Sequence, residues 1–307
     1  MGTPEIAVES LDFLNKNDEI EVCAVVTQMD RPKGRGNKLT PPPIKEWALA
    51  NNVPCFQPER ISKDSELIEK LKALDVDFFV TFAFGQILSQ EVIDIPKFAT
   101  VNLHASLLPK YRGANPIQRC IYNGDKETGI TTMLTVLALD AGDICETEVI
   151  SITENMTDVD LRNEISQKSP QLLLSTLKGL YNGTLKPKSQ DENGVTIAKK
   201  FQKQDGLIDW NRTSQEIHNH VRSMIEFPTA YTMYQGKMLK IIETEVLDKK
   251  YNVQGGEVVL TSKNGIEVAT TNGVLLIKQV KPESKGIMKA CDFVNGAKIK
   301  AGDKLGE

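Results

Sequence analysis

An asparagine and a histidine stand two residues apart in this chain, at Asn102 and His104, and an aspartate follows further along at Asp140. An asparagine amide can donate a hydrogen bond to a developing oxyanion. A histidine exchanges a proton near neutral pH, and an aspartate can orient its imidazole. No serine or cysteine is placed beside them as an obvious nucleophile. These residue types therefore suit direct acyl transfer to an amine of the substrate, through a tetrahedral intermediate.

Two predicted strands must position these side chains. Residues 98–103 read as a buried strand, and because side chains alternate along a strand, Asn102 and His104 share one face. Ligands of open α/β sheets bind beyond the carboxyl ends of the strands, where His104 lies. A second strand over 129–139 ends in the turn that holds Asp140. A histidine near a strand and an aspartate in a turn are often structural, so spacing alone leaves both interpretations open.

The longer pattern around these residues is more specific. The segment reads N-x-H-x-S-L-L-P-x-Y-R-G-x-x-P-I, then G-I-T, then L-D-x-G-D. It resembles the 10-formyltetrahydrofolate-dependent formyltransferases. The resemblance implies 10-formyltetrahydrofolate as the formyl donor, no metal, and Asn102, His104 and Asp140 as the catalytic residues. It also implies a folate-contacting loop made of Ser106, Leu107, Leu108 and Pro109.

Residues 27–43 resemble the long loop of the methionyl-tRNA formyltransferases, with Met29 where that group usually has proline, and the similarity continues to the C-terminus. This implies methionyl initiator tRNA as the acceptor. The loop's cations would then neutralise tRNA phosphates, with Arg35 as the principal contact. They are Arg31, Lys33, Arg35 and Lys38. A solvated flexible loop is the competing interpretation.

Three other functions stay open at this point. One is a formyltransferase that acts on a sugar-nucleotide amine or another small amine. The second is a formyltetrahydrofolate hydrolase, with water as the acceptor. The third is a tRNA-binding protein without catalysis.

The order of the elements predicts an α/β fold in two domains. Alternating strands and helices over 1–184 favour a Rossmann-like, mostly parallel, doubly wound sheet of the formyltransferase type. The polar stretch 185–203 reads as a linker. Over 204–307, a helix capped by Thr213 and Glu216 precedes five short strands with hairpin turns at Gln235-Gly236, Asn264-Gly265 and Asn272-Gly273. This pattern suggests a small OB-like β-barrel for tRNA binding.

The start of the chain departs from the expected pattern. The segment from Pro4 to Asn15 reads as a helix, whereas a doubly wound domain opens with a strand, and related formyltransferases carry one just before Gly2. The first strand of the 1–184 domain is thus expected to be missing. Its loss would leave two neighbouring strands with unpaired backbone groups. We therefore expect a true start upstream of Met1 rather than a domain that lacks this strand.

Composition sets the remaining bounds. The net charge of −4 argues against a globally basic nucleic-acid coat, although it allows local basic patches. No apolar run is long enough for a membrane span, and no signal peptide is visible. The five cysteines are odd in number and form no C-x-x-C pair, so neither a disulfide framework nor a zinc site is expected. We expect a cytoplasmic monomer with no membrane partner.

Overall fold

The computed structural model describes residues 1–33 and 36–306 and forms two compact units. The N-terminal unit contains residues 1–116, 127–151 and 162–198. The C-terminal unit contains residues 117–126, 152–161 and everything described from Lys199 on. The stretch 185–198, which the sequence suggested as part of a linker, therefore packs within the N-terminal unit.

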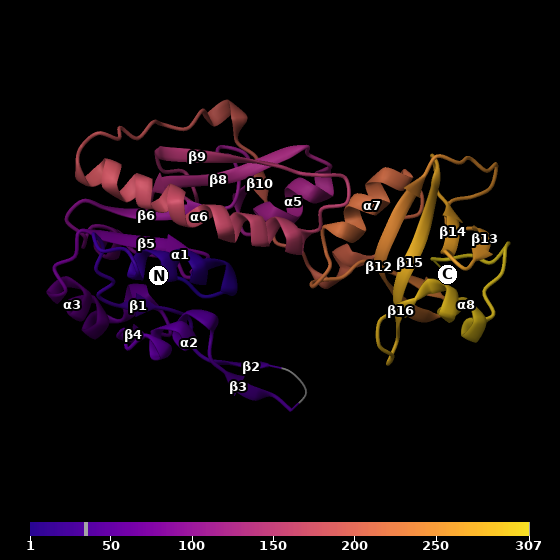
Figure 1. Cartoon of the computed structure of the whole chain (residues 1–307), viewed down its shortest axis with the longest axis horizontal. Coiled ribbons are helices and arrows are strands. Elements are labelled where there is room, and N and C mark those ends of the chain that lie inside the picture. Colours follow the sequence, from indigo (N-terminus) through magenta and orange to yellow (C-terminus); the bar gives the residue numbers. More distant parts are fainter. Residues whose placement is uncertain (34–35, 307) are drawn as a thin grey trace. The chain divides into compact units, whose positions relative to one another are not determined.

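A four-stranded sheet in the order β5-β6-β8-β9 carries the N-terminal unit (Figure 1). Its strands are β5 (Phe78–Phe82), β6 (Ala99–His104), β8 (Glu127–Leu134) and β9 (Ile144–Ser151). β5 and β6 pair in parallel, whereas β6–β8 and β8–β9 are antiparallel. This sheet is therefore mixed rather than mostly parallel. The connection between β8 and β9 is too short for the crossover that a parallel pair needs, so β9 has to return antiparallel.

A two-residue parallel pair, β1 (Val25–Val26) with β4 (Cys55–Phe56), lies at the other side of this unit. Gly2 joins the two groups of strands. Its N–H donates to the Val26 carbonyl at 3.0 Å, and it forms a parallel bridge with Phe82 of β5. Two residues at the start of the chain therefore occupy a strand position between β1 and β5.

The remaining elements of this unit are short helices and two small strand pairs. The helices are η1 (Glu5–Ala7), α1 (Val8–Asn15), α2 (Pro43–Ala50), η2 (Ile61–Lys63), α3 (Ser65–Ala73), α4 (Gln90–Ile93) and η3 (Glu192–Gly194). The pairs are an antiparallel hairpin of β2 (Arg31–Lys33) with β3 (Lys38–Thr40), and a parallel contact of β7 (Arg112–Gly113) with β10 (Ile197–Ala198). In α3, the Asp64 side chain caps the helix by accepting from the Leu67 N–H at 3.0 Å, which satisfies one otherwise unpaired donor.

The longest helix, α6 (Asp158–Tyr181), runs through Pro170, where the sequence predicted an interruption. Proline removes one backbone hydrogen bond from a helix. Buried Leu161, Ile165, Leu173 and Leu177 flank this position and hold the helix in place by tertiary packing. The Thr176 hydroxyl lies 2.7 Å from that of Thr132 on β8, so α6 packs against the sheet that carries the candidate site.

The C-terminal unit is built on a six-stranded antiparallel sheet in the order β11-β12-β15-β14-β13, with β16 paired to β15. The strands are β11 (Tyr231–Tyr234), β12 (Lys237–Leu247), β13 (Val258–Ser262), β14 (Gly265–Ala269), β15 (Val274–Pro282) and β16 (Met288–Lys289). Its other elements are α5 (Pro116–Asn123), η4 (Lys203–Gly206), α7 (Ser214–Arg222) and α8 (Ala290–Ala297). The core gathers Ile217, Leu239, Ile241, Ile266 and Ile277.

Local sequence signals in this unit hold in the structure. Thr213 and Glu216 form both hydrogen bonds of a capping box at the start of α7. Gln235 and Gly236 both have positive φ, 51° and 71°, as the tight turn between β11 and β12 requires. The predicted cap and this hairpin turn are therefore confirmed.

Candidate active site

The carboxyl end of β6 presents Asn102 and His104 on one side of the strand. Asn102 lies opposite Thr81 of β5, whose hydroxyl donates to the Asn102 Oδ1 at 2.7 Å. This contact uses the acceptor side of the amide and turns its donor, Nδ2, away from Thr81. β5 therefore orients Asn102 as a hydrogen-bond donor.

His104 is held by a backbone carbonyl. Its Nε2 lies 2.9 Å from the Tyr111 oxygen, and only 7% of its side chain is exposed. A carbonyl can only accept a hydrogen bond, so Nε2 carries the hydrogen. Nδ1 is therefore the nitrogen that gains and loses a proton. It faces the Asp140 Oδ2 at 3.7 Å, which is longer than a hydrogen bond.

Asp140 owes its place to its own backbone and to two distant segments. It has φ 49°, a left-handed conformation that aspartate tolerates better than most residues. Its Oδ2 accepts a hydrogen bond from the Gly113 N–H at 2.7 Å. The Gln190 Nε2 donates to the carbonyls of Asp140 and Gly142, both at 2.8 Å. Asp140 is thus fixed at its side chain and at its main chain.

Residues 188–198, called the strap below, secure this arrangement. Arg112, with only 7% of the residue exposed, donates from Nε to the Gln190 Oε1 at 3.0 Å and from Nη2 to the Glu192 Oε1 at 2.8 Å. β10 of the strap pairs with β7, and Lys188 exchanges two backbone hydrogen bonds with Ile144. The stretch returns past β9 to β10 (Figure 1). The sequence gave no reason to expect this role, because its polar composition resembles a linker.

The predicted folate-contacting loop is closed by internal hydrogen bonds. The Ser106 hydroxyl donates to the Lys110 carbonyl at 2.7 Å. The Thr131 hydroxyl donates to the Ser106 carbonyl at 2.7 Å and accepts from the Leu108 N–H at 3.1 Å. Ser106 and Leu108 are buried, whereas Leu107 and Pro109 keep exposed surface. Leu107 and Pro109 are therefore the side chains of this loop that a ligand can touch.

The predicted tRNA-binding cations lie on the β2–β3 hairpin. Arg31 and Lys38 are exposed, and Lys33 is in register with Lys38 across the two strands. Arg35, the predicted principal contact, lies outside the described residues.

A cavity of about 690 Å³ adjoins the base of this hairpin. Arg31 lines it together with Arg60 and Lys63, and Gly85 and Gln86, which follow the carboxyl end of β5, form another part of its wall. Three cations facing one Glu59 make this cavity suited to anionic groups. In residues 1–33 and 36–306, no three His, Cys, Asp or Glu side chains gather as a metal site would require. Across the same residues, no helix has the length and hydropathy to cross a bilayer.

Two family sequence models match the chain. The formyl transferase model matches residues 1–177, and the model of the formyl transferase C-terminal domain matches residues 200–298. The chain is 45% identical to a methionyl-tRNA formyltransferase of Clostridium tetani over 302 residues, which are 98% of this chain and 97% of that protein. It is 44% identical to one of Fusobacterium nucleatum over 307 residues, 99% of this chain and 98% of that protein.

Solved structures share the fold at lower identity. WlaRD, a sugar 3N-formyl transferase crystallised with dTDP and 5-N-formyl-tetrahydrofolate, superposes with a TM-score of 0.67 at 22% identity and covers 93% of this chain and 97% of its own. An N-formyltransferase from Helicobacter canadensis, in complex with folinic acid and dTDP-3-aminofucose, gives 0.66 at 20% identity, with 90% of this chain and 96% of its own covered.

Proposed function

This chain belongs to the formyl transferase family, and from that premise we propose that it formylates methionyl initiator tRNA. The formyl group would pass from 10-formyltetrahydrofolate to the amino group of the methionyl residue, which gives N-formylmethionyl-tRNA for translation initiation. The observation that supports this most is the identity of 44–45% to methionyl-tRNA formyltransferases over nearly the whole length of both chains. The reaction places the protein in the cytoplasm, and we propose that it acts as a monomer.

We propose Asn102, His104 and Asp140 as the catalytic residues. As the amine attacks the formyl carbon, negative charge develops on the formyl oxygen, and the Asn102 Nδ2 can donate a hydrogen bond to it. Protonated His104 stabilises the same charge. Asp140 stabilises the imidazolium and helps to relay the proton that the amine releases to the folate nitrogen.

The spacing of 3.7 Å between Nδ1 and Oδ2 supports this assignment. The far side of each group is already held, His104 by the Tyr111 carbonyl and Asp140 by the Gly113 N–H. Their remaining capacity therefore faces the gap between them. Catalytic hydrogen bonds are often long in free enzymes and tighten in the complex with substrate.

The folate is proposed to lie along the loop that contains Ser106, Leu107, Leu108 and Pro109. Because Ser106 and Leu108 are buried, we assign the direct contacts to Leu107 and Pro109, whose exposed apolar surface suits a flat ring system. Ser106 and Leu108 then shape the loop through their bonds to Lys110 and Thr131.

We propose that the tRNA is held by Arg31, Lys33, Arg35 and Lys38 and by the C-terminal unit. The C-terminal six-stranded sheet is proposed to be an OB-like domain, a fold that binds nucleic acid on its strand face. In terms of the chain, 1–184 would be the catalytic domain, 185–203 the connection and 204–307 the tRNA-binding domain. Affinity for tRNA should then fall steeply as salt is raised.

The test is a formylation assay with purified protein and 10-formyltetrahydrofolate. Methionyl initiator tRNA is compared with a dTDP-amino sugar and with water alone. We expect formylmethionyl-tRNA, and we expect Asp140→Asn to lower kcat by roughly 10³-fold or more, since the proton relay is lost. Asp143→Asn changes the same turn in the same chemical way and should keep activity within about twofold. Formylation of the sugar alone, or formate release without an amine, would contradict the proposed acceptor.

A further inference from the structure

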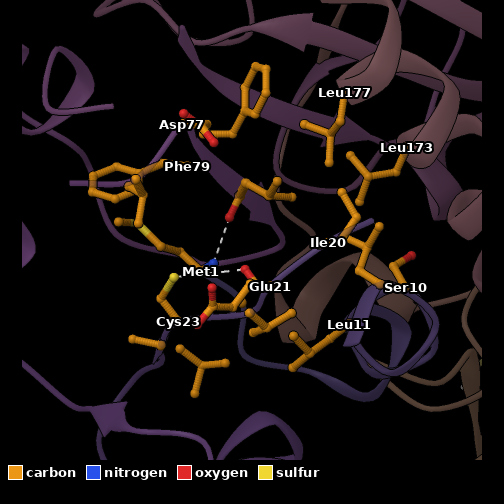
Figure 2. A pocket seen from close by; sticks show the side chains of 18 of the residues that line it. Met1, Ser10, Leu11, Ile20, Glu21, Cys23, Asp77, Phe79, Leu173 and Leu177 are labelled. Carbon is orange, nitrogen blue, oxygen red and sulfur yellow. Dashed lines mark hydrogen bonds between the residues drawn. The ribbon is translucent and has the colours of Figure 1, made fainter. Parts of the chain in front are cut away.

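A cavity of about 680 Å³ lies in the N-terminal unit beside the first residue of the chain (Figure 2). Residues 19–26 line one side, residues 74–80 another, and α6 contributes Leu173 and Leu177. Its volume is within the range of ordinary ligand pockets. It does not hold any residue that we assign to catalysis, so it needs an explanation of its own.

One end of this cavity already contains a short piece of strand. The Met1 amine donates to the Val80 carbonyl at 2.6 Å, and the Phe82 N–H donates to the Met1 carbonyl at 3.0 Å. Gly2 makes the matching contact on the other side, to the Val26 carbonyl at 3.0 Å. Two residues thus pair with β1 and β5 at once, as a central parallel strand would. The cavity continues this strand toward the amino ends of its neighbours.

The alternation of strand amides fixes what the cavity offers next. Consecutive residues of a strand point their backbone groups to opposite sides. Met1 faces β5 and Gly2 faces β1, so a residue preceding Met1 would face the Ala24 carbonyl and the Val26 N–H. The residue before it would face the Phe78 carbonyl and the Val80 N–H. Ala24, Val26, Phe78 and Val80 all line the cavity.

The walls indicate which side chains would fit. Leu11 and Leu14 of α1 and Leu173 and Leu177 of α6 line the cavity, and Figure 2 shows Leu11, Leu173 and Leu177 around it. A parallel strand covered on both faces is apolar throughout rather than alternating. The occupant should therefore be a run of Val, Ile or Leu without charge.

We propose that this cavity is a strand-acceptor site, which takes an extended apolar peptide of about five residues as a parallel strand between β1 and β5. The carboxyl end of the peptide meets Met1 and continues the register that Met1 and Gly2 begin. Backbone hydrogen bonds supply the pairing, and the apolar walls select the side chains.

The experiment extends the full chain by five residues ahead of Met1. One variant carries Val-Ile-Val-Val-Ile, and its matched control carries Ser-Asn-Ser-Ser-Asn. We expect the apolar extension to raise the Tm by roughly 5 °C or more relative to the control. We also expect amide exchange at Val26 and Val80 to slow at least tenfold, because these two N–H groups gain acceptors, whereas amides of the C-terminal unit stay unchanged.

A peptide added in trans serves as a second route if the apolar extension makes the chain insoluble. The same five residues, acetylated and amidated, are titrated into the unextended protein, and the polar peptide is the control. Slower exchange at Val26 and Val80 with the apolar peptide alone supports the proposal. Equal exchange and equal Tm with both sequences, in cis and in trans, would overturn it and leave the cavity as hydrated space. Neither result bears on formyl transfer, which is assayed separately.

Discussion

The amino group of Met1 should make the stability of this protein depend on pH in a range where few other groups titrate. It lies at the cavity between β1 and β5 and donates to the Val80 carbonyl. Burial lowers the pKa of this amine from 8.0 to about 5. Between these values the unfolded chain binds a proton that the folded chain does not. Lowering the pH from 8 to 5 therefore favours unfolding.

The size of the effect follows from the pKa difference. Three pH units at about 1.36 kcal/mol each give about 4 kcal/mol of unfolding free energy, present above pH 8 and lost by pH 5. Burial also lowers the pKa of two histidines, His218 and His220, the latter to about 4. They act in the same direction but only below their ordinary value of 6.5. From pH 8 to 6.5 the amine alone should cost about 2 kcal/mol.

The assay is urea unfolding at half-unit steps from pH 6.5 to 8, on protein whose intact Met1 is confirmed by mass spectrometry. The control is the same chain acetylated at its amino terminus, which removes the titrating group. We expect the free energy of unfolding to rise with pH in the free chain and to stay nearly level in the acetylated one. Only the slopes are compared, because the acetyl group itself changes the absolute stability. Identical slopes would show that the amine is not buried as described.

Three further outcomes are expected. Gly129→Ala would place a Cβ 2.1 Å from a backbone oxygen of β9 and 2.5 Å from the Leu107 Cδ2, so the free energy of unfolding should fall by about 1–3 kcal/mol in urea denaturation; an unchanged midpoint would contradict the packing. Arg112→Lys keeps the charge but loses the forked contacts to the strap, so kcat should fall about tenfold with little change in Tm, and wild-type kcat would exclude a positioning role. Arg31→Ala and Lys38→Ala should each lower the salt dependence of tRNA binding by about one unit of log–log slope; an unchanged slope would remove that residue from the interface.

The sequence predicted well those features that depend on neighbouring residues. The capping box of α7 and the Gln235-Gly236 hairpin need only residue types at short spacing. The pleat of β6 likewise puts Asn102 and His104 on one face. The mixed sheet was missed because an alternating pattern shows that a strand exists but does not show the direction of its neighbours.

The groups that hold the candidate site could not have been predicted in the same way. The Tyr111 carbonyl and the Gly113 N–H are backbone atoms, which every residue possesses and no motif can mark. Gln190 acts 50 residues from Asp140, in a stretch whose composition is that of a loop. The left-handed backbone of Asp140 follows from the turn it closes. Long-range polar contacts of this kind are determined by tertiary structure.

The strap has a consequence for the order in which this protein matures during synthesis. The sheet and α6 are complete once the ribosome has added residue 181, yet Gln190, Glu192 and β10 are still to come. Domains fold from the amino end as they emerge, so a nascent chain of that length can form the scaffold while Asp140 still lacks its anchors. The spacing between Asp140 and His104 becomes fixed only when translation passes Ala198, so a chain released earlier would be folded and inactive.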